Sequence, residues 1–452
     1  MSETTARRSN GYAWVVAVVG FMLGIGTITG TMAWGYISPF LAQSFNIEVT
    51  DIAIVMSVYS CLNMGLGFLV GILGENFGPR FVCGIGQFLG GLFLTLAGIF
   101  TGSLVVVCVF FVLSGVCVSC CGSTLPPKIY SAWFAPKWRS KAMTGNTLGG
   151  SLFGSALGLI IPALIVAGGW QGAFKWLGVI VMAAAVVWLV FGRNKPSDMG
   201  MIPFGEDPDT YVEEVAVELT EEQKAAAKAE RRAGLAKVFK NKYTWIFGIF
   251  YIFWMTYGMG VNTFQITAIM AAGNDITMAG ALASVNTLLI AASQFLWGAL
   301  ADKFSRKRIL GLTVICGGLM YIFCYFVLNN GGVGAIVWAV FLIQGFFTGN
   351  VNVIQTLLAE VFTPDTRAIG PGVIVTLSLI GSFCGPVLGS VWIGGFAGNV
   401  ISIFLFGALM CVISGLIALF LLPNTGGKYG DPMVEQYNKE HGIGVEAGVE
   451  AE

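Results

Sequence analysis

The chain has 452 residues, of which 56% are apolar and 11% are charged, with no formal net charge and a mean hydropathy of +0.79. Soluble domains carry roughly 25% charged residues, and a soluble chain this apolar would expose large apolar patches. The neutral balance argues against a nucleic-acid-binding protein, and the length excludes a small disulfide-bonded scaffold. These values indicate an integral membrane protein.

Runs of roughly 20 mostly apolar residues, long enough to cross a bilayer, recur along the whole chain. Six runs lie in each half, so the sequence predicts an all-α membrane protein with 12 transmembrane helices in two pseudo-symmetric six-helix bundles. The predicted spans cover residues 13–38, 51–73, 81–101, 104–127, 143–166, 171–192, 243–270, 279–300, 308–328, 333–359, 369–394 and 398–422.

The polar segments divide the chain into five parts. The middle one holds 19 of the 48 charged residues, and its run Thr220–Gln223 predicts a capping box at the start of a polar helix that ends near Lys240. The expected parts are a cytoplasmic N-terminus (1–11), an N-terminal bundle (12–192), a cytoplasmic linker (193–242), a C-terminal bundle (243–422) and a cytoplasmic tail (423–452).

Lysine and arginine are distributed unevenly among the connections between spans. Connections after odd-numbered spans contain neither residue, whereas every connection after an even-numbered span carries at least one of them. Cytoplasmic connections are the ones enriched in these cations. The sequence therefore predicts a multi-pass protein of the cell membrane with both termini in the cytoplasm.

The two halves contain the same short motifs at nearly the same offset. Gly71–Arg80 follows the second span and Gly298–Lys307 the eighth, with an acid four residues and a cation nine residues after the first glycine. Phe134–Arg139 and Phe362–Arg367 share a proline and an arginine after the fourth and tenth spans. The offsets of 227 and 228 residues indicate a duplicated six-helix unit.

These paired motifs, within a pattern of six plus six spans, resemble the major facilitator superfamily over residues 12–422. Gly78–Arg80 and the stretch Trp133–Phe174 are similar to the oxalate–formate, monocarboxylate and anion–cation symporter branches. The resemblance implies the major facilitator fold and a secondary transporter whose halves rock about a midplane site. Ser305 departs from the pattern because it replaces the second glycine in the C-terminal copy, so that turn is expected to be less tight.

The cytoplasmic motifs are predicted to form a gate in which acids pair with arginines and helix ends when the inner side is closed. Glu360, at the inner end of the tenth span, is interpreted as part of this network, and a proton-coupling carboxylate is the alternative. The candidate gating residues are Gly71, Glu75, Gly78, Arg80, Arg139, Gly298, Asp302, Arg306, Lys307, Glu360 and Arg367.

Polar faces run along the first, fourth, seventh and tenth spans, which the resemblance places around a central cavity. In the tenth span, polar side chains recur at steps of three or four residues and share one helix face. Interhelical hydrogen bonding is the alternative role for the amides. The candidate substrate-binding residues are Thr31, Trp34, Thr124, Lys128, Tyr257, Asn262, Gln265, Gln294, Thr348, Asn352 and Gln355.

The substrate class rests on Lys128 and on neutral positions elsewhere. Lys128 follows Pro126–Pro127 in the inner half of the fourth span, where it either meets an anionic substrate or extends to the cytoplasmic headgroups. Gln294 is neutral where dicarboxylate carriers of the resembling families place a cation, which favours a monoanion.

We therefore expect a monomeric carrier of a small organic monoanion (a carboxylate) by alternating access, through proton symport or anion exchange. An exporter of drugs or other apolar compounds is the alternative. The expected partners are the substrate, the lipid bilayer and a coupling proton or counter-anion, with no nucleic acid. The sequence contains no catalytic triad, metal-ligand cluster or phosphate-binding loop, so we expect no enzymatic activity, cofactor or metal.

Gly150, Gly154 and Gly158 follow one another at four-residue steps in the fifth span. Such a row lets two helix backbones approach closely, so it predicts tight helix packing.

Overall fold

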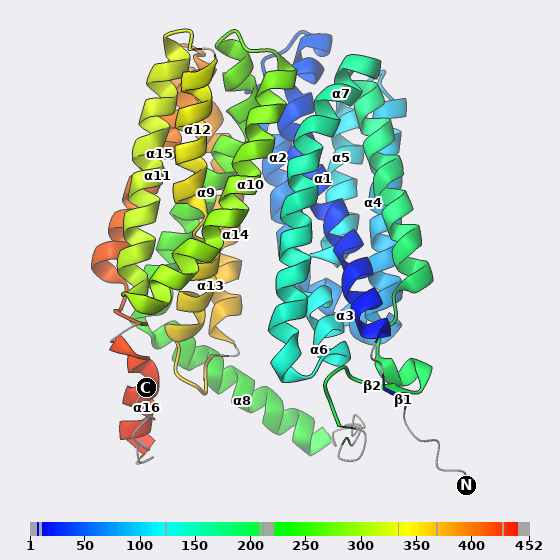
Figure 1. Cartoon of the computed structure of the whole chain (residues 1–452), viewed down its shortest axis with the longest axis vertical. Coiled ribbons are helices and arrows are strands. Elements are labelled where there is room, and N and C mark those ends of the chain that lie inside the picture. Colours follow the sequence, from blue (N-terminus) through cyan, green and yellow to red (C-terminus); the bar gives the residue numbers. More distant parts are fainter. Residues whose placement is uncertain are drawn as a thin grey trace. The chain divides into compact units, whose positions relative to one another are not determined.

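The computed structural model describes residues 7–8, 11–122, 124–207, 211, 221–332, 334–367, 369–426 and 429–441, most of which are helical (Figure 1). The chain forms two compact units. Unit 1 comprises residues 1–215, 262–288 and 386–401, and unit 2 comprises residues 216–261, 289–385 and 402–452.

Six predicted spans belong to unit 1. The apolar faces of α4 pack against α5 and α7, and α1 packs along α7. Small residues permit the close approach, since a Cβ on Gly91 of α4 would lie 2.7 Å from the carbonyl oxygen of Gly178. The helices of these spans are α1 (Tyr12–Phe45), α2 (Ala53–Gly65), α3 (Gly67–Phe77), α4 (Pro79–Ile99), α5 (Leu104–Val118), α6 (Leu125–Trp133) and α7 (Pro136–Phe191).

The 56 residues of α7 cross the membrane twice. The helix is interrupted at Gly168 and Gly169, and Gly169 has a φ of +66°, a conformation that side chains with a Cβ rarely adopt. The chain turns back there, so the two segments correspond to the predicted fifth and sixth spans (Figure 1). With α2 and α3 taken as one span bent by 45°, the described residues contain all 12 predicted spans.

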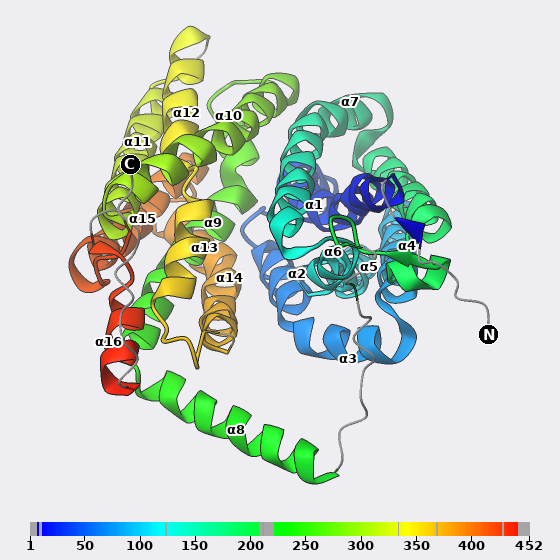
Figure 2. The same ribbon diagram turned by 60° about the horizontal axis from the view of Figure 1, so that its bottom comes forward.

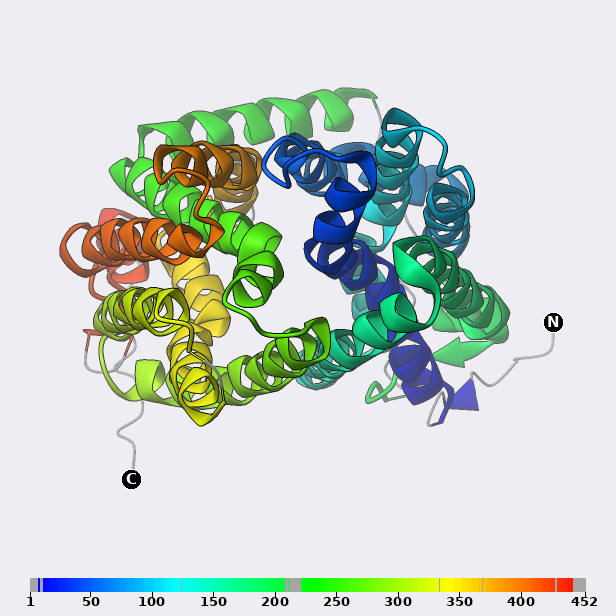
Figure 3. The same cartoon turned by 90° about the horizontal axis from the view of Figure 1, so that it is seen from above.

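The helices of the second half follow the same order. Within unit 2, α11 packs between α12 and α15 (Figure 3). The last parts of α9 and α14 and the first part of α10 belong to unit 1. The helices are α9 (Lys242–Ala271), α10 (Ile276–Lys303), α11 (Arg306–Asn329), α12 (Ala335–Thr348), α13 (Val351–Glu360), α14 (Gly370–Gly395) and α15 (Ile403–Leu421), the last preceded by the 3-10 turn η3 (Val400–Ser402).

The fourth and tenth spans are both interrupted along their length, although the hydropathy pattern predicts continuous helices. Between α5 and α6 lie the 3-10 turn η1 (Ser119–Cys121) and Gly122, and between α12 and α13 lie Gly349 and Asn350. Gly122 and Gly349 are 227 residues apart, the offset of the internal repeat. Apolar composition does not reveal these breaks because each half-helix is itself apolar.

The segments outside the spans contain short elements. Strand β1 (Arg7–Arg8) pairs in parallel with β2 (Met201–Ile202), which follows the 3-10 turn η2 (Pro196–Met199). The helix α8 (Glu221–Lys240) lies within the segment predicted as the linker, while Thr220 of the predicted capping box lies outside the described residues. The tail adds α16 (Pro432–His441), which lies beside the end of α8 (Figure 2).

Candidate functional site

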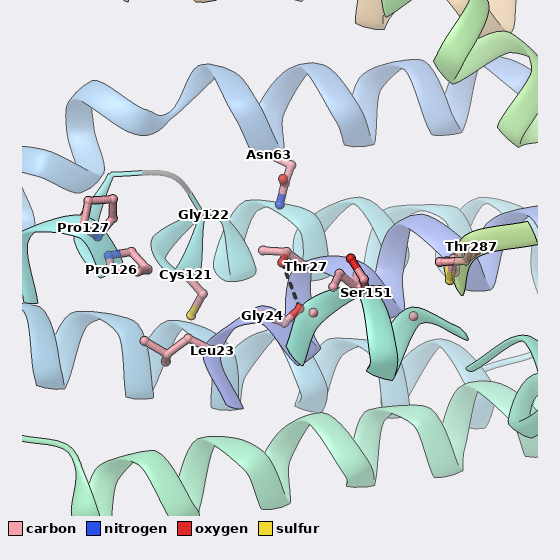
Figure 4. A pocket seen from close by; sticks show the side chains of 14 residues that line it. Leu23, Gly24, Thr27, Asn63, Cys121, Gly122, Pro126, Pro127, Ser151 and Thr287 are labelled. Atoms are coloured by element: carbon pink, nitrogen blue, oxygen red, sulfur yellow. Dashed lines mark hydrogen bonds between the residues drawn. The ribbon is translucent and has the colours of Figure 1, made fainter. Parts of the chain in front are cut away.

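A cavity of about 550 Å³ lies in unit 1 beside the break in the fourth span (Figure 4). This volume is within the range of roughly 300–1,000 Å³ that small-molecule sites occupy. None of its 14 lining residues, all of them described, carries a charge. The lining residues are Leu23, Gly24, Thr27, Ile28, Met32, Asn63, Cys121, Gly122, Pro126, Pro127, Gly150, Ser151, Gly154 and Thr287.

The glycine row of α7 shapes one wall of this cavity. The predicted tight packing is found at Gly158, where a Cβ would lie 2.9 Å from the carbonyl oxygen of Gly280 on α10. Gly150 and Gly154 also line the cavity, and a Cβ at Gly154 would meet Ile28 at an ordinary 3.4 Å. The same row of glycines therefore allows close helix packing at one position and leaves room for the cavity at the other two.

Three polar side chains in the wall each donate one hydrogen to a backbone carbonyl. Thr27 Oγ1 donates to the Gly24 carbonyl at 3.0 Å, and Thr287 Oγ1 donates to the Ala283 carbonyl at 2.8 Å. Asn63 Nδ2 donates to the Gly115 carbonyl at 3.0 Å. Lone pairs of these three oxygens remain as acceptors for a ligand.

The candidate substrate-binding residues lie outside the wall of this cavity. In unit 1, Trp34 is 1% exposed and packs on Phe111 with 4.7 Å between ring centroids. Thr31 donates to the Thr27 carbonyl at 3.0 Å, and Thr124 occupies the N-cap position of α6. Asn262 and Gln265 are half-buried on α9.

Unit 2 has a smaller cavity of about 320 Å³, between α10 and α13. It brings together Gln294 and Asn352, two of the candidate substrate-binding residues, with Gly298, Asp302 and Arg306 of the predicted gate. The other candidates in this unit lie elsewhere: Tyr257 is buried against Trp254 and Tyr321, Thr348 bonds its own helix, and Gln355 is exposed.

Lys128 has a protein counter-charge. Its Nζ lies 2.9 Å from Oε1 of Glu75, and the side chains of Lys128 and Glu75 are 47% and 72% exposed. The acid of the N-terminal motif thus reaches across from α3 to α6. Gln355, which is 227 residues after Lys128, is neutral, so the C-terminal half has no equivalent pair.

The cations of the two glycine motifs cap helix ends. Arg80 Nε donates to the Leu189 carbonyl at 3.2 Å, at the end of α7, and Lys307 Nζ donates to the Leu422 carbonyl at 3.1 Å, after α15. Carbonyls at a helix C-terminus lack intrahelical partners and favour a cation. The repeated cation therefore joins the third span to the sixth, and the ninth to the twelfth. Gly71 and Gly298 lie earlier in the same motifs, on α3 and α10.

The turn between glycine and cation differs between the halves, as the departure at Ser305 predicts. Gly78 has a φ of +80°, and Asn194 Oδ1 accepts a hydrogen bond from the backbone of Arg80 at 2.7 Å. Ser305 has an ordinary φ of −75°, and its Oγ donates to Asn424 Oδ1 at 3.0 Å. In each half an asparagine that follows the last span fixes this turn.

The arginines of the second pair of motifs make similar hydrogen bonds to the backbone. Arg139 Nε donates to the Phe134 carbonyl at 2.9 Å, and Arg367 Nη2 lies 3.5 Å from the Phe362 carbonyl. Arg367 also pairs with Asp431, next to the start of α16, at 2.5 Å. Each arginine thus bonds to the backbone just after the second helix of a broken span, α6 or α13.

Asn63 and Thr27 line the cavity but are not among the substrate-binding residues predicted from the sequence. Asn63 is the one amide in the apolar stretch 53–73, and an isolated amide in a membrane span is itself a signal for a functional position. Thr27 shares the polar face of the first span with Thr31, one turn away. The sequence predicts that face but not which of its turns meets the cavity.

Two sets of six spans with paired motifs in the connections define a multi-pass membrane transporter and not an enzyme. The chain belongs to the Major Facilitator Superfamily, whose family model matches residues 16–273 and 258–436.

Named relatives match between 39% and 85% of the chain. The 4-hydroxybenzoate transporter PcaK of Acinetobacter baylyi is 25% identical over 404 residues, which cover 85% of this chain and 84% of that protein. The probable L-galactonate transporter of Escherichia coli is 26% identical over 276 residues, 58% of this chain and 55% of that protein. The hexuronate transporter of Bacillus subtilis is 23% identical over 180 residues, 39% of this chain and 42% of that protein.

Solved structures share the fold. The D-xylose–proton symporter has a TM-score of 0.70 at 15% identity and covers 92% of this chain and 100% of its own. A bacterial homolog of the human lysosomal transporter Spinster has a TM-score of 0.66 at 17% identity, covering 91% of this chain and 95% of its own. The predicted fold class is thereby confirmed.

Proposed function

We propose that this protein carries a small organic monocarboxylate, of about the size of a benzoate, across the membrane by alternating access. The observation that carries the proposal is the uncharged cavity beside the broken fourth span, which has apolar walls and a few polar atoms. Three relatives named above are, by their names, transporters of 4-hydroxybenzoate, L-galactonate and hexuronate. A carboxylate class is common to these names.

The absence of charge in the cavity wall argues against a doubly charged substrate. A dicarboxylate would need more than one protein cation, and the described lining residues offer none. Gln294 and Asn352 in the cavity of unit 2 are candidates for further polar contacts. Tyr257, Asn262, Gln265, Thr348 and Gln355 remain candidates for other stages of the transport cycle.

The proposal includes a cytoplasmic location for both termini, a monomer as the working form, and coupling by proton symport or anion exchange. The positive charge of the connections after even-numbered spans supports the orientation. The ion pairs at the cytoplasmic ends of the helices supply a gate that can open and close. The bundles and linker predicted as 12–192, 193–242 and 243–422 are the proposed moving parts.

Substrate binding and transport test this proposal in two steps. Ligands that bind the folded protein raise its melting temperature in detergent, so benzoates, aldonates, dicarboxylates and lipophilic cations are compared at equal concentration. We expect stabilisation by monocarboxylates and counterflow of radiolabelled 4-hydroxybenzoate in proteoliposomes. Stabilisation by lipophilic cations alone would overturn the proposal in favour of a drug exporter. Counterflow with and without an imposed pH gradient separates proton symport from exchange.

A further inference from the structure

The cavity of unit 1 presents acceptors where a carboxylate needs donors. Thr27, Asn63 and Thr287 each give a side-chain hydrogen to a backbone carbonyl at 2.8–3.0 Å. An ionised carboxylate accepts hydrogen bonds only, so it gains nothing from the hydroxyl oxygens of Thr27 and Thr287, whose single hydrogens are already committed. Asn63 retains only the second hydrogen of its amide group as a donor. The Sγ of Cys121 is likewise directed to a backbone carbonyl, that of Cys83, at 3.3 Å.

The orientation of Asn63 follows from its partner. The Gly115 carbonyl is an acceptor in the last turn of α5, so the amide edge that faces it must be the NH₂ group. Asn63 projects from α2 toward the side of the cavity where Thr27 and Cys121 lie (Figure 4). Among the described residues no donor reaches its Oδ1, which leaves this oxygen for a ligand.

The backbone at the broken span lacks two of the N–H groups that could bind an anion. In transporters, the N-terminus of a discontinuous helix often points its free N–H groups at an anionic substrate group. At the start of α6, however, Pro126 and Pro127 occupy the first turn and have no N–H. Both prolines line the cavity. The nearest cation along the chain, Lys128, is paired with Glu75.

We propose that this cavity binds the hydroxyl end of the substrate, and that Asn63 is the specificity-determining residue that selects a hydroxylated acid. The substrate hydroxyl donates its hydrogen to Asn63 Oδ1, with Thr27 Oγ1 as a second acceptor. The carboxylate is directed away from these oxygens. This inference rests on the proposed carboxylate transport and adds the requirement for a hydrogen-bond donor on the substrate.

Three ligands distinguish the effect of a hydroxyl hydrogen on affinity from the effects of ligand size and polarity. 4-Hydroxybenzoate carries the donor, 4-methoxybenzoate keeps the oxygen but has no hydrogen on it, and benzoate lacks both. Affinities are measured by titration calorimetry with the full-length protein in detergent. We expect 4-hydroxybenzoate to bind about 10-fold more tightly than either analogue, as one net hydrogen bond allows.

Variants then locate the acceptor. In Asn63→Leu the ratio of the 4-hydroxybenzoate and benzoate affinities should fall from about 10 to about 1, because the acceptor is removed. Asn76, exposed on α3, provides the matched control Asn76→Leu, in which the ratio should be unchanged. If Asn63→Leu does not fold, Thr27→Val replaces it, and its ratio should fall at least twofold.

The outcomes separate this inference from the proposed function. Equal affinities for the three benzoates in the unmodified protein would overturn the hydroxyl requirement and leave carboxylate binding intact. A preference that persists in both Asn63→Leu and Thr27→Val would overturn the role of this wall. Binding of none of the three would refute the proposed function, and the inference with it.

Discussion

Arg306 at the start of α11 forms an ion pair with Glu360 at the end of α13, with 2.7 Å between Nη1 and Oε1. The two side chains are only 14% and 16% exposed, and Nη2 of the same guanidinium lies 2.8 Å from Asp302. Arg306 therefore joins the end of the eighth span, the start of the ninth and the end of the tenth.

Replacing Glu360 by Gln should destabilise the protein more than replacing Asp302 by Asn. Removing one partner of a well-buried pair leaves an uncompensated charge and costs up to about 3–5 kcal/mol, whereas exposed pairs contribute about 0–1 kcal/mol. Asp302 is 70% exposed and serves as the matched control. The melting temperature in detergent measures both variants. Equal losses would contradict the view that Glu360 supplies the main counter-charge.

Lys128→Gln should retain carboxylate binding. Glu75 neutralises the ammonium group at 2.9 Å, and both side chains are largely exposed. A double-mutant cycle with Glu75→Gln should give a coupling energy of about 1 kcal/mol or less, which decreases as salt is added. Calorimetry with benzoates measures binding. Loss of carboxylate binding in Lys128→Gln, but not in Glu75→Gln, would assign Lys128 to the substrate instead.

Gly78→Ala should destabilise the N-terminal half, whereas the equivalent turn in the C-terminal half tolerates a side chain. Gly78 has a φ of +80°, and an added Cβ would lie 2.8 Å from Asn194 Nδ2. A left-handed conformation costs a residue with a Cβ about 1–2 kcal/mol, before any clash. Ser305→Ala keeps an allowed φ and loses one hydrogen bond, about 1 kcal/mol. Unfolding midpoints of the two variants compare them directly.

The pair between Lys237 and Asp365 ties the end of α8 to the loop after α13 and should act only within a window of pH. Lys237 donates to Asp365 at 2.7 Å, and this hydrogen bond holds the pKa of the carboxyl below its usual 3.8. The same bond raises the pKa of Lys237 above 10.5.

The sign of the effect follows from these shifts. Because folding lowers the pKa of Asp365, its contribution is present above the unfolded-state value and is lost as pH falls below about 4. Because folding raises the pKa of Lys237, that contribution is lost only as pH rises above about 10.5. The melting temperature of Asp365→Asn should lie below that of the unmodified protein near pH 7, and the difference should shrink as the pH falls below about 4. A constant difference down to pH 3 would contradict an ionic contribution.

Hydropathy and repeats predict the fold well because both depend on composition over many residues. The twelve spans, the linker helix and the paired motifs follow from such averages, and the break at Gly168–Gly169 falls between two predicted spans. The breaks after η1 and at Gly349 escape this kind of reasoning, since a few residues change direction within an apolar run.

Candidate site residues are harder to predict because periodicity identifies a face and not a depth. Thr31 and Thr27 share one face of α1, yet only Thr27 lines the cavity. Whether Lys128 binds a substrate depends on whether a protein carboxylate already neutralises it. That carboxylate belongs to Glu75, which lies 53 residues earlier in the chain. Such pairings arise from how helices pack, which spacing within one span does not encode.

A larger residue at Gly154 should block the cavity without disturbing the fold. Its added Cβ would meet Ile28 at 3.4 Å, an ordinary contact, and further atoms would enter the cavity. Gly154→Leu is therefore expected to abolish benzoate binding and counterflow with little change in melting temperature, while Gly154→Ala retains binding. Gly158→Leu provides the contrast, because its side chain would strike the Gly280 backbone and should unfold or misassemble the protein. Full binding by a well-folded Gly154→Leu variant would place the substrate outside this cavity.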